Sequence, residues 1–340
     1  MAHAILSIAA AADIVKAGGL VAFPTETVYG LGADASSDAA VAKIFAAKGR
    51  PADHPLIVHV ANMAAAEQFA AAMPDFARKL CAAFWPGPLT VIVPRRAGVA
   101  TASAGGQNSI GLRCPAHPMA LEFLHSCAAR GVPGVAAPSA NKFGKVSPTT
   151  AQHVRDELGA ELAVLDGGAC DVGIESTIID CTRSAPVLLR PGVLSTQQLE
   201  AAMGRKLLLN AELLEQDLLG LEADLAFNLT VPRASGTLES HYAPNARLRL
   251  MDAKALQTAL NLLGEDAANM AMYSRVVLVS KSIRLIRRRM PDDALATAQQ
   301  LFAVLRSFDA QGVKLIWVET PPQDSAWDGV RDRLQRAAAH

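Results

Sequence analysis

The stretch that decides the fold is GGLVAFPTETVYGLGADA at residues 18–35, followed by KIFAAKGRPADHPLIVHV at residues 43–60. Its apolar run at residues 20–23 predicts a short buried strand, because Pro24 stops the run and a glycine-containing turn follows. The polar residues 25–27 come directly after that proline. Hydroxyl and carboxylate side chains are therefore expected together at the end of a buried strand.

The second part of this stretch adds cations to the same neighbourhood. Residues 39–47 carry apolar side chains at helical spacing, so Lys48 is expected in the last turn of a helix. A Gly-Arg-Pro sequence then ends the helix and leaves Lys48 and Arg50 on a loop, free to meet an anion. His59 interrupts the apolar strand expected at residues 56–60. Each residue alone is explained as well by a helix cap or a buried histidine, but their concentration favours a binding site.

Three later strands also end in polar side chains. Two of them end in arginines, Arg113 and Arg190, whose planar guanidinium groups suit carboxylate or phosphate partners. A third strand, at residues 134–137, is followed by Ser139 and Asn141. Ligands of α/β sheets collect beyond strand ends, so we expect both arginines to face one crevice. Surface salt bridges and ordinary turn chemistry stay open as simpler explanations for these residues.

Residues 245–340 alternate apolar runs with helical patterns, which indicates a small sheet covered by helices. Strands are expected near residues 247–251, 276–279 and 315–318, and helices near residues 253–263, 292–308 and 328–336. The basic run IRLIRRRM at residues 283–290 is expected to form a solvated helix or loop face, with RNA contact as the alternative.

Composition narrows the class of protein. Thirty-two basic and thirty-two acidic residues give zero net charge, which argues against a protein whose main task is to grip a phosphate backbone. The five cysteines have no CxxC spacing, and no window approaches the roughly 20 apolar residues of a membrane helix. We expect a soluble, cytoplasmic protein with reduced thiols. P-loop, GxGxxG, HExxH and GxSxG motifs are all missing from the sequence.

Several segments together identify a family. PTETVYGLG, KGRP, PLIVHV, WPGPLT, APSAN, SPT, ESTI and LLRPG resemble, in order and spacing, the Sua5/YrdC/YwlC family of threonylcarbamoyl-AMP synthases. SHYAP at residues 240–244 resembles the longer, Sua5-type members. The resemblance implies an α/β fold with a YrdC/RibB-like twisted, open, mixed sheet and a concave face in residues 1–205. It further implies a linker at residues 206–244 that covers the active site, and a smaller Rossmann-like Sua5 domain at residues 245–340.

The family chemistry assigns roles to individual residues. The resemblance implies catalytic roles for Lys48 and Arg50. It implies ATP contacts from Arg50, His54, Ser109, Ser139, Asn141, Ser147, Arg190, His241 and Tyr242, and L-threonine contacts from Thr25, Thr27, His59, Arg113, Ala137 and Ser176. His54 departs from the family pattern, because many members have asparagine before the proline. The residues just before HYAP also differ from the usual ones, so contact from residues 235–240 is a weaker expectation.

The implied reaction is the synthesis of threonylcarbamoyl-AMP. L-threonine and bicarbonate give a carbamate, whose carboxylate oxygen attacks the α-phosphorus of ATP and releases pyrophosphate. Mg²⁺ is expected to bridge the phosphates of ATP, without a metal site built by the protein alone. A downstream tRNA threonylcarbamoyl transferase would use the product to complete t6A at position 37 of tRNA, and no membrane partner is expected.

Two other classes compete with this interpretation. The first is a noncatalytic module that binds double-stranded RNA, suggested by the concave fold and the basic run. The second is a carbamoyl-transferring hydrogenase-maturation enzyme, which normally carries cysteine-rich zinc motifs that this chain lacks. Zero net charge weakens the first class, and the missing zinc motifs weaken the second.

Overall fold

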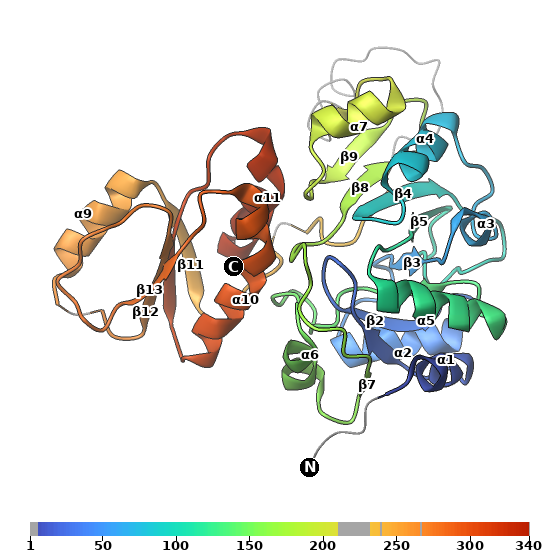
Figure 1. Cartoon of the computed structure of the whole chain (residues 1–340), viewed down its shortest axis with the longest axis horizontal. Helices are drawn as coiled ribbons and strands as arrows, with labels where there is room; N and C mark the ends of the chain where they lie inside the picture. Colours follow the sequence, from blue (N-terminus) through green and yellow to red (C-terminus); the bar gives the residue numbers. More distant parts are fainter. Residues whose placement is uncertain (1–5, 210–231, 239, 266, 340) are drawn as a thin grey trace.

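Two β-sheets organise the chain, one in the N-terminal part and one in the C-terminal part (Figure 1). The computed structural model describes residues 6–209, 232–238, 240–265 and 267–339. Its mixed sheet of ten strands and its second, parallel sheet of four strands confirm the expected α/β class. The sequence is rich in leucine and acidic residues at residues 207–225, and its part from residue 210 onward lies outside the described residues.

The larger sheet has the strand order β10-β9-β8-β4-β5-β3-β6-β2-β1-β7. Its strands are β1 (Val21–Phe23), β2 (Gly30–Asp34), β3 (Ile57–His59), β4 (Leu89–Pro94), β5 (Ser109–Arg113), β6 (Val135–Ala136), β7 (Ala163–Val164), β8 (Thr177–Asp180), β9 (Val187–Arg190) and β10 (Leu208–Leu209). The helices of this part are α1 (Ile8–Lys16), α2 (Asp38–Lys48), α3 (Met63–Ala66), α4 (Asp75–Phe84), α5 (Pro118–Ala129), α6 (Ala151–Leu158) and α7 (Thr196–Met203). Because β10 pairs with β9, the sheet continues past residue 205.

Successive side chains of the short strands β1 and β3 point to opposite faces of this sheet, so they pack in two separate hydrophobic clusters. Val21 and Phe23 pack with α1 and α5, whereas Ala22 packs in the cluster that contains α2, α4 and α7. Val58 of β3 faces the second cluster, and its neighbour His59 meets Phe23 on the first face. Helices therefore cover both faces but leave the ends of the central strands available for polar side chains.

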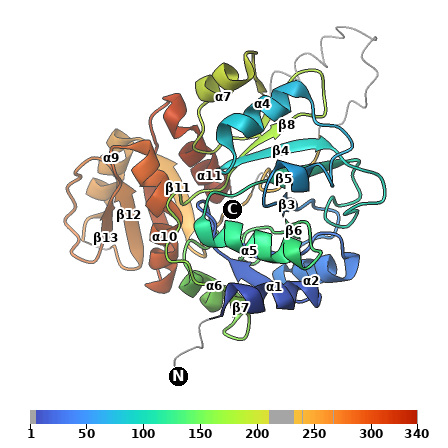
Figure 2. The same cartoon turned by 45° about the vertical axis from the view of Figure 1, so that its right-hand side comes forward.

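The C-terminal sheet is parallel throughout, with the order β11-β14-β12-β13. It comprises β11 (Arg247–Met251), α9 (Ala253–Leu263), β12 (Met270–Ser274), β13 (Ile286–Arg289), α10 (Ala294–Ala310), β14 (Leu315–Glu319), a 3₁₀ turn (Ser325–Trp327) and α11 (Asp328–Ala338). Helix α9 packs on one face, and α10 and α11 pack on the other, where they also meet Val28, Val146 and Ile174 of the larger part. Figures 1 and 2 show α10 and α11 between the small sheet and the rest of the molecule.

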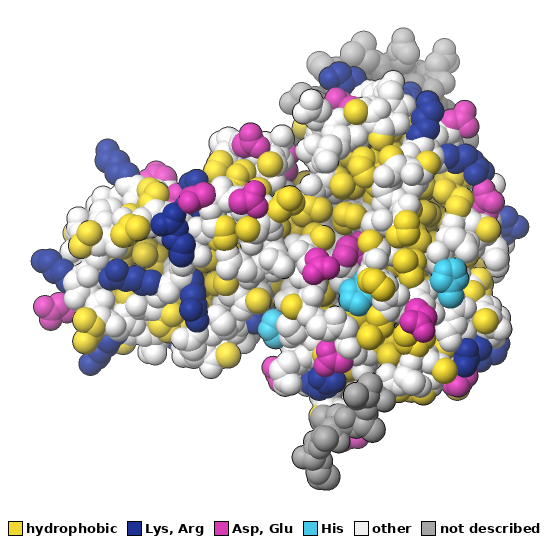
Figure 3. Space-filling view, viewed as in Figure 1, with side chains coloured by type: hydrophobic (Ala, Val, Ile, Leu, Met, Phe, Trp, Pro, Cys, Tyr) yellow, Lys and Arg dark blue, Asp and Glu magenta, His cyan; other side chains and the backbone are white. Residues whose placement is uncertain are grey.

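Two expectations for this sheet are wrong. Residues 276–279 form no strand: Val277 and Val279 are 85% and 72% exposed in a loop, and the strand lies earlier, at β12. All of β12 is buried between β14 and β13, so burial outweighs the β-branched preference of residues 276–279. The basic run is neither helix nor loop alone, because residues 286–289 form the edge strand β13 with exposed arginines. Figure 3 shows Lys and Arg side chains spread over this part of the surface.

Other expectations are confirmed. All five cysteines are unpaired and buried. Within the described ranges, no helix has the length and the apolar character that crossing a bilayer requires.

Two glycines allow the backbones of the two parts to pack closely at their junction. Gly329 of α11 lies so close to the larger part that a Cβ atom at this position would be 2.5 Å from the carbonyl oxygen of Gly192 and 2.8 Å from Ile174 Cδ1. Gly173 makes a similarly close approach to the backbone of α10 at Ala298 and Gln299. Neither contact leaves room for a larger side chain, so both helices are held at fixed positions.

We predict that Gly329→Ala destabilises the protein by about 1–3 kcal/mol, because the added methyl group must push α11 away from Gly192. The midpoint of thermal unfolding measures this effect. Gln335→Ala, an exposed substitution on the same helix, is the control and should change the midpoint little. Helix propensity alone would make Gly329→Ala at least as stable as wild type. Such a result would contradict the tight junction.

Candidate active site

One cleft collects most of the polar residues that the sequence singles out. Its lining comes from the β1–β2 turn, the end of α2, strands β3, β5 and β9, the loop after β6, the segment before β8 and residues 235–236 and 241–242. The cleft is lined by Thr25, Val28, Gly30, Lys48, Arg50, Ile57, His59, Arg113, Ala137, Pro138, Ser139, Asn141, Phe143, Gly144, Glu175, Ser176, Arg190, Ser235, Gly236, His241 and Tyr242. Its empty volume is about 560 Å³, and part of this space is open solvent.

Lys48 is buried at the floor of this cleft. It is the last residue of α2, and Gly49 ends the helix in a left-handed conformation with φ 64°. Its Nζ donates a 2.6 Å hydrogen bond to the carbonyl oxygen of Ser139 and a second hydrogen bond to that of Asn141. Burial, followed by the charge of Arg50, lowers the pKa of Lys48 well below its usual value. The expectation that Lys48 lies on an open loop is therefore wrong.

Arg50 lies beside Lys48 with its hydrogen-bonding capacity only partly used. Its Nη2 donates to the carbonyl oxygen of Pro55 at 3.0 Å and to Ser235 Oγ at 3.5 Å, and its guanidinium lies 5.6 Å from the centre of the Phe143 ring. Burial lowers the pKa of Arg50 to about 10, so the group stays charged at neutral pH. Its buried Nε has no partner among the described residues.

Arg190 lines the same cleft as Arg50, and both residues contact Ser235. Its Nε and Nη2 donate to the carbonyl oxygen of Ser176 at 3.1 and 3.0 Å, and its Nη1 donates to that of Ser235 at 2.8 Å. Gly236 follows at φ 76°, where a Cβ atom would lie 2.8 Å from Arg190 Nη1 and would clash with the Tyr242 hydroxyl. The segment that contains Ser235 and Gly236 therefore lies directly over both arginines.

Arg113 forms the other polar end of the cleft. Its Nη2 makes a 2.7 Å ion pair with Glu26 Oε1, and its Nε donates to the carbonyl oxygen of Gly87 at 3.3 Å. Burial, followed by the charge of Arg113, lowers the pKa of the neighbouring His59 to about 3, so its imidazole is neutral. Thr25 Oγ1 lies 2.9 Å from Thr27 Oγ1 and donates to the carbonyl oxygen of Val28. This end offers one charged donor and neutral polar groups.

Glu175 is the carboxylate among the lining residues of the cleft. Ser147 Oγ donates to its Oε1, and Arg333 Nε of α11 donates to its Oε2 at 2.8 Å. Burial alone would raise the pKa of Glu175, but attraction to Arg333 and then to Arg190, with the Ser147 hydrogen bond, holds the pKa below its usual value. Glu175 is therefore ionised at neutral pH.

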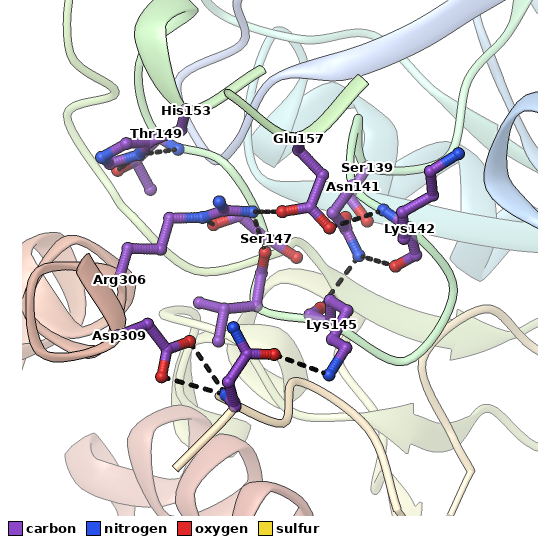
Figure 4. Close-up of polar contacts among 12 residues, drawn as sticks. Ser139, Asn141, Lys142, Lys145, Ser147, Thr149, His153, Glu157, Arg306 and Asp309 are labelled. Atoms are coloured by element: carbon purple, nitrogen blue, oxygen red, sulfur yellow. Dashed lines mark hydrogen bonds and ion pairs between the residues drawn. The ribbon is translucent and has the colours of Figure 1, made fainter. Parts of the chain in front are cut away.

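The loop at residues 139–149 is held in place from both parts of the molecule (Figure 4). Asn141 Nδ2 donates to the carbonyl oxygens of Lys142 and Lys145 at 2.7 and 2.9 Å. Arg306 of α10 donates to the carbonyl oxygens of Val146 and Ser147 and makes a 3.0 Å ion pair with Glu157 of α6. The C-terminal part thus contacts the loop that carries Ser139 and Asn141.

The cleft brings together twelve of the residues that the sequence analysis assigns to substrates. These are Thr25, Lys48, Arg50, His59, Arg113, Ala137, Ser139, Asn141, Ser176, Arg190, His241 and Tyr242. Burial is also the main reason that the pKa of His241 falls to about 3 and that of Tyr242 rises to about 12.

Four predicted site residues are outside the lining of the cleft. Thr27 contacts the lining residue Thr25, and Ser147 contacts the lining residue Glu175. His54 packs edge-on against Phe143, with ring centres 5.4 Å apart, and burial followed by Arg50 lowers its pKa. Ser109 lines a smaller neighbouring pocket, which it shares with Ser235.

Phe143 and Arg333 escaped the sequence analysis. Phe143 lies two residues after the APSAN segment, and an aromatic at that distance from polar turn residues is a usable signal. Arg333 has no local signal, because its partner Glu175 lies 158 residues earlier in the chain.

Several buried polar atoms in the cleft have no partner in the part of the chain that the structure describes. They are Arg50 Nε, His59 Nδ1, Asn141 Oδ1 and His241 Nδ1. Buried polar atoms are normally hydrogen-bonded, so this concentration indicates a site shaped for a polar ligand. Three buried cations, Lys48, Arg50 and Arg190, make an anionic ligand the best match.

Comparison with known proteins covers both parts of the chain. The Sua5, YciO and YrdC family profile, described as telomere recombination, matches residues 13–192. The profile described as threonylcarbamoyl-AMP synthase, C-terminal domain, matches residues 194–339. The two profiles meet just after β9, which ends at Arg190.

Full-length relatives agree with these profiles. The threonylcarbamoyl-AMP synthase of Pyrococcus abyssi is 35% identical over 337 residues, covering 97% of this chain and 93% of the relative. That of Bacillus subtilis is 35% identical over 339 residues, covering 97% and 92%. The crystal structure of Pyrococcus abyssi Sua5 complexed with L-threonine matches with a TM-score of 0.83 over 97% of this chain and 94% of that one. The chain therefore belongs to the Sua5/YrdC family, in the longer form that carries a Sua5-type C-terminal domain.

Proposed function

We propose that this protein is an L-threonylcarbamoyladenylate synthase, which makes threonylcarbamoyl-AMP and pyrophosphate from L-threonine, bicarbonate and ATP. Relatives that match almost its whole length are named threonylcarbamoyl-AMP synthases, and one was crystallised with L-threonine. The observation that carries the proposal is the cleft in which Lys48, Arg50 and Arg190 are buried beside unpaired polar atoms. The comparisons give no support to the alternative of a noncatalytic RNA-binding module.

The reaction needs alignment and charge stabilisation more than a covalent nucleophile. The amine of L-threonine attacks the carbon of bicarbonate, and loss of water leaves a carbamate. A carboxylate oxygen of the carbamate then bonds to the α-phosphorus of ATP, while the bond from that phosphorus to the bridging oxygen breaks and pyrophosphate leaves. We assign Lys48, Arg50 and Arg190 to the phosphates, where fixed cations stabilise the charge that builds up on the leaving group.

The nucleotide would lie against the loop after β6 and the linker. Ser139, Asn141, His241 and Tyr242 line the cleft on that side, and the unpaired Asn141 Oδ1 is an acceptor suited to a hydroxyl or amino group. Ser147 and His54 would act indirectly, through Glu175 and Phe143. Ser109 would reach the nucleotide only from the neighbouring pocket.

L-threonine would occupy the end of the cleft near Arg113. The Nη1 of Arg113 makes no hydrogen bond to the described residues, so it can bind the substrate carboxylate while Nη2 stays paired with Glu26. Neutral His59 offers an unpaired Nδ1, and Thr25, with Thr27 behind it, and Ser176 add hydroxyl groups. Ala137 provides a small apolar wall beside Gly30, which fits a short side chain.

Mg²⁺ is proposed to arrive bound to the phosphates of ATP, as part of the substrate. Across the described ranges, no group of three or more His, Cys, Asp or Glu side chains could hold a metal ion. Both carboxylate oxygens of Glu175 already accept hydrogen bonds, from Ser147 and Arg333. We therefore assign no resident metal ligand among the described residues.

The product would be consumed by a tRNA threonylcarbamoyl transferase, which we propose as the downstream partner in t6A formation. The product is a mixed anhydride, whose threonylcarbamoyl group can be transferred to the tRNA with AMP as the leaving group, so a second enzyme must supply the tRNA. A weak RNA contact through the exposed arginines of β13 and a cytoplasmic location complete the proposal.

We predict that the purified protein releases pyrophosphate from ATP only when both L-threonine and bicarbonate are present, with L-serine a poorer substrate. A coupled pyrophosphate assay measures the release, and reactions without amino acid or without bicarbonate are the controls. Well-folded protein that releases no pyrophosphate, or releases it equally without amino acid, would refute the proposed function.

We predict that Lys48→Ala lowers kcat/KM for ATP by about 10²-fold or more, because one preorganised cation is lost from the phosphate site. Lys43→Ala is the matched control on the same helix, since Lys43 is exposed and donates only to the carbonyl oxygen of Gly18. It should stay within about twofold of wild type, and thermal midpoints show whether either variant is misfolded. Equal activity of the two variants would remove Lys48 from the phosphate site.

A further inference from the structure

Helix α11, the last helix of the chain, sends one arginine into the larger part of the molecule. We propose that this residue, Arg333, is a positioning residue for the ATP site: it holds the Glu175 carboxylate so that the cleft cations stay available for phosphates. This inference rests on the proposed function, because it presumes that the cleft binds ATP. It also gives the C-terminal domain a defined task in the reaction.

Arg333 contacts two segments of the larger part, and its Nη1 also forms a 2.6 Å ion pair with Asp332 of its own helix. Nε donates to Glu175 Oε2 at 2.8 Å, Nη2 donates to the carbonyl oxygen of Glu175 at 3.2 Å, and Nη1 donates to that of Pro191 at 2.9 Å. The Arg333 side chain is fully buried, and that of Glu175 is 8% exposed. Pro191 directly follows Arg190, so a single guanidinium fixes the backbone on both sides of the Ser176–Arg190 contact.

The charge of Glu175 explains why this matters for a phosphate site. Glu175 lines the same cleft as Lys48 and Arg190, and its Oε1 accepts from Ser147. Burial lowers the pKa of Arg190, and the Glu175 carboxylate partly opposes that effect, so the two charges interact. Without Arg333, a buried carboxylate would be left uncompensated beside the cations and would repel the triphosphate.

A second contact ties Arg333 to the linker. Its guanidinium lies 5.1 Å from the centre of the Tyr242 ring, and Phe302 of α10 stacks on that ring with centres 5.6 Å apart. Tyr242 has a φ of 61°, a left-handed conformation that a tyrosine keeps only when its surroundings hold it. Its hydroxyl meets Gly236, the residue beside Arg190 Nη1. Arg333 therefore supports the phosphate site from two directions.

Another arginine of the same helix provides a matched comparison. Arg331 pairs with Asp328 and donates to the carbonyl oxygens of Pro322 and Asp324, all within the C-terminal part. It is only partly exposed, yet within the described ranges its polar contacts all stay in the C-terminal part. If substitution of Arg333 has an effect that substitution of Arg331 lacks, that effect comes from the site and not from the loss of an arginine in α11.

The test is a double-mutant cycle on the full-length protein, with ATP affinity and L-threonine affinity measured by isothermal titration calorimetry. We expect Arg333→Met to weaken ATP binding by about tenfold or more, which is the effect of one uncompensated charge near the phosphates at an effective dielectric constant of about 20. L-threonine binding should change much less. Arg331→Met should stay within about twofold of wild type for both substrates.

The second half of the cycle separates positioning from mere structural support. Adding Glu175→Gln to Arg333→Met removes the unpaired charge, so the double variant should regain ATP affinity by severalfold over Arg333→Met alone. Equal losses for ATP and L-threonine, or a double variant no better than the single one, would overturn the inference. So would an Arg333→Met protein that binds ATP as Arg331→Met does.

The wild-type protein keeps the two proposals distinguishable. Wild type that binds ATP but releases no pyrophosphate with L-threonine and bicarbonate would refute the proposed function, and the binding cycle would still decide the role of Arg333. Wild type that releases pyrophosphate while Arg333→Met matches it in kcat and in KM for ATP would refute the positioning role alone. Wild type that binds no ATP would overturn both.

Discussion

Burial of cations in one cleft, three of them without an ion-pair partner among the described residues, is the constraint on which the rest of the structure depends. Lys48, Arg50 and Arg190 are each less than a tenth exposed, and a buried charge is costly unless it is paired or hydrogen-bonded. The protein meets this cost mainly with backbone carbonyls of Ser139, Asn141, Ser176 and Ser235. Carbonyls stabilise a cation without cancelling its charge, so the cleft keeps a positive field that an anionic substrate can use.

The same constraint explains why two sheets are joined so tightly. Glu175, the carboxylate among the described lining residues of the cleft, is held by an arginine of the C-terminal helix, and the loop after β6 is held by Arg306 of α10. The close backbone contacts at Gly173 and Gly329 bring these helices within reach. The C-terminal domain therefore supports the site, although none of the described lining residues of the cleft lies beyond the linker.

Local patterns predicted much of this arrangement. The α/β class, the helix that ends at Lys48 and the two strand-end arginines follow from short apolar runs, glycine and proline, because these features act within a few residues. The sequence did not predict burial of Lys48, the contacts of Ser235 and Arg333, or strand β12, because each depends on packing between segments far apart in the chain. Residues 276–279 look more like a strand than β12 does, and only the neighbouring strands decide between them.

The central claim is that the cleft joins a carbamate of L-threonine to AMP. The most direct measurement is mass spectrometry of the reaction product formed from ATP, L-threonine and carbon-13-labelled bicarbonate. The account predicts an adenylate that contains threonine and carries the label, formed together with pyrophosphate. An adenylate of threonine without the label, or no adenylate from folded protein, would contradict it.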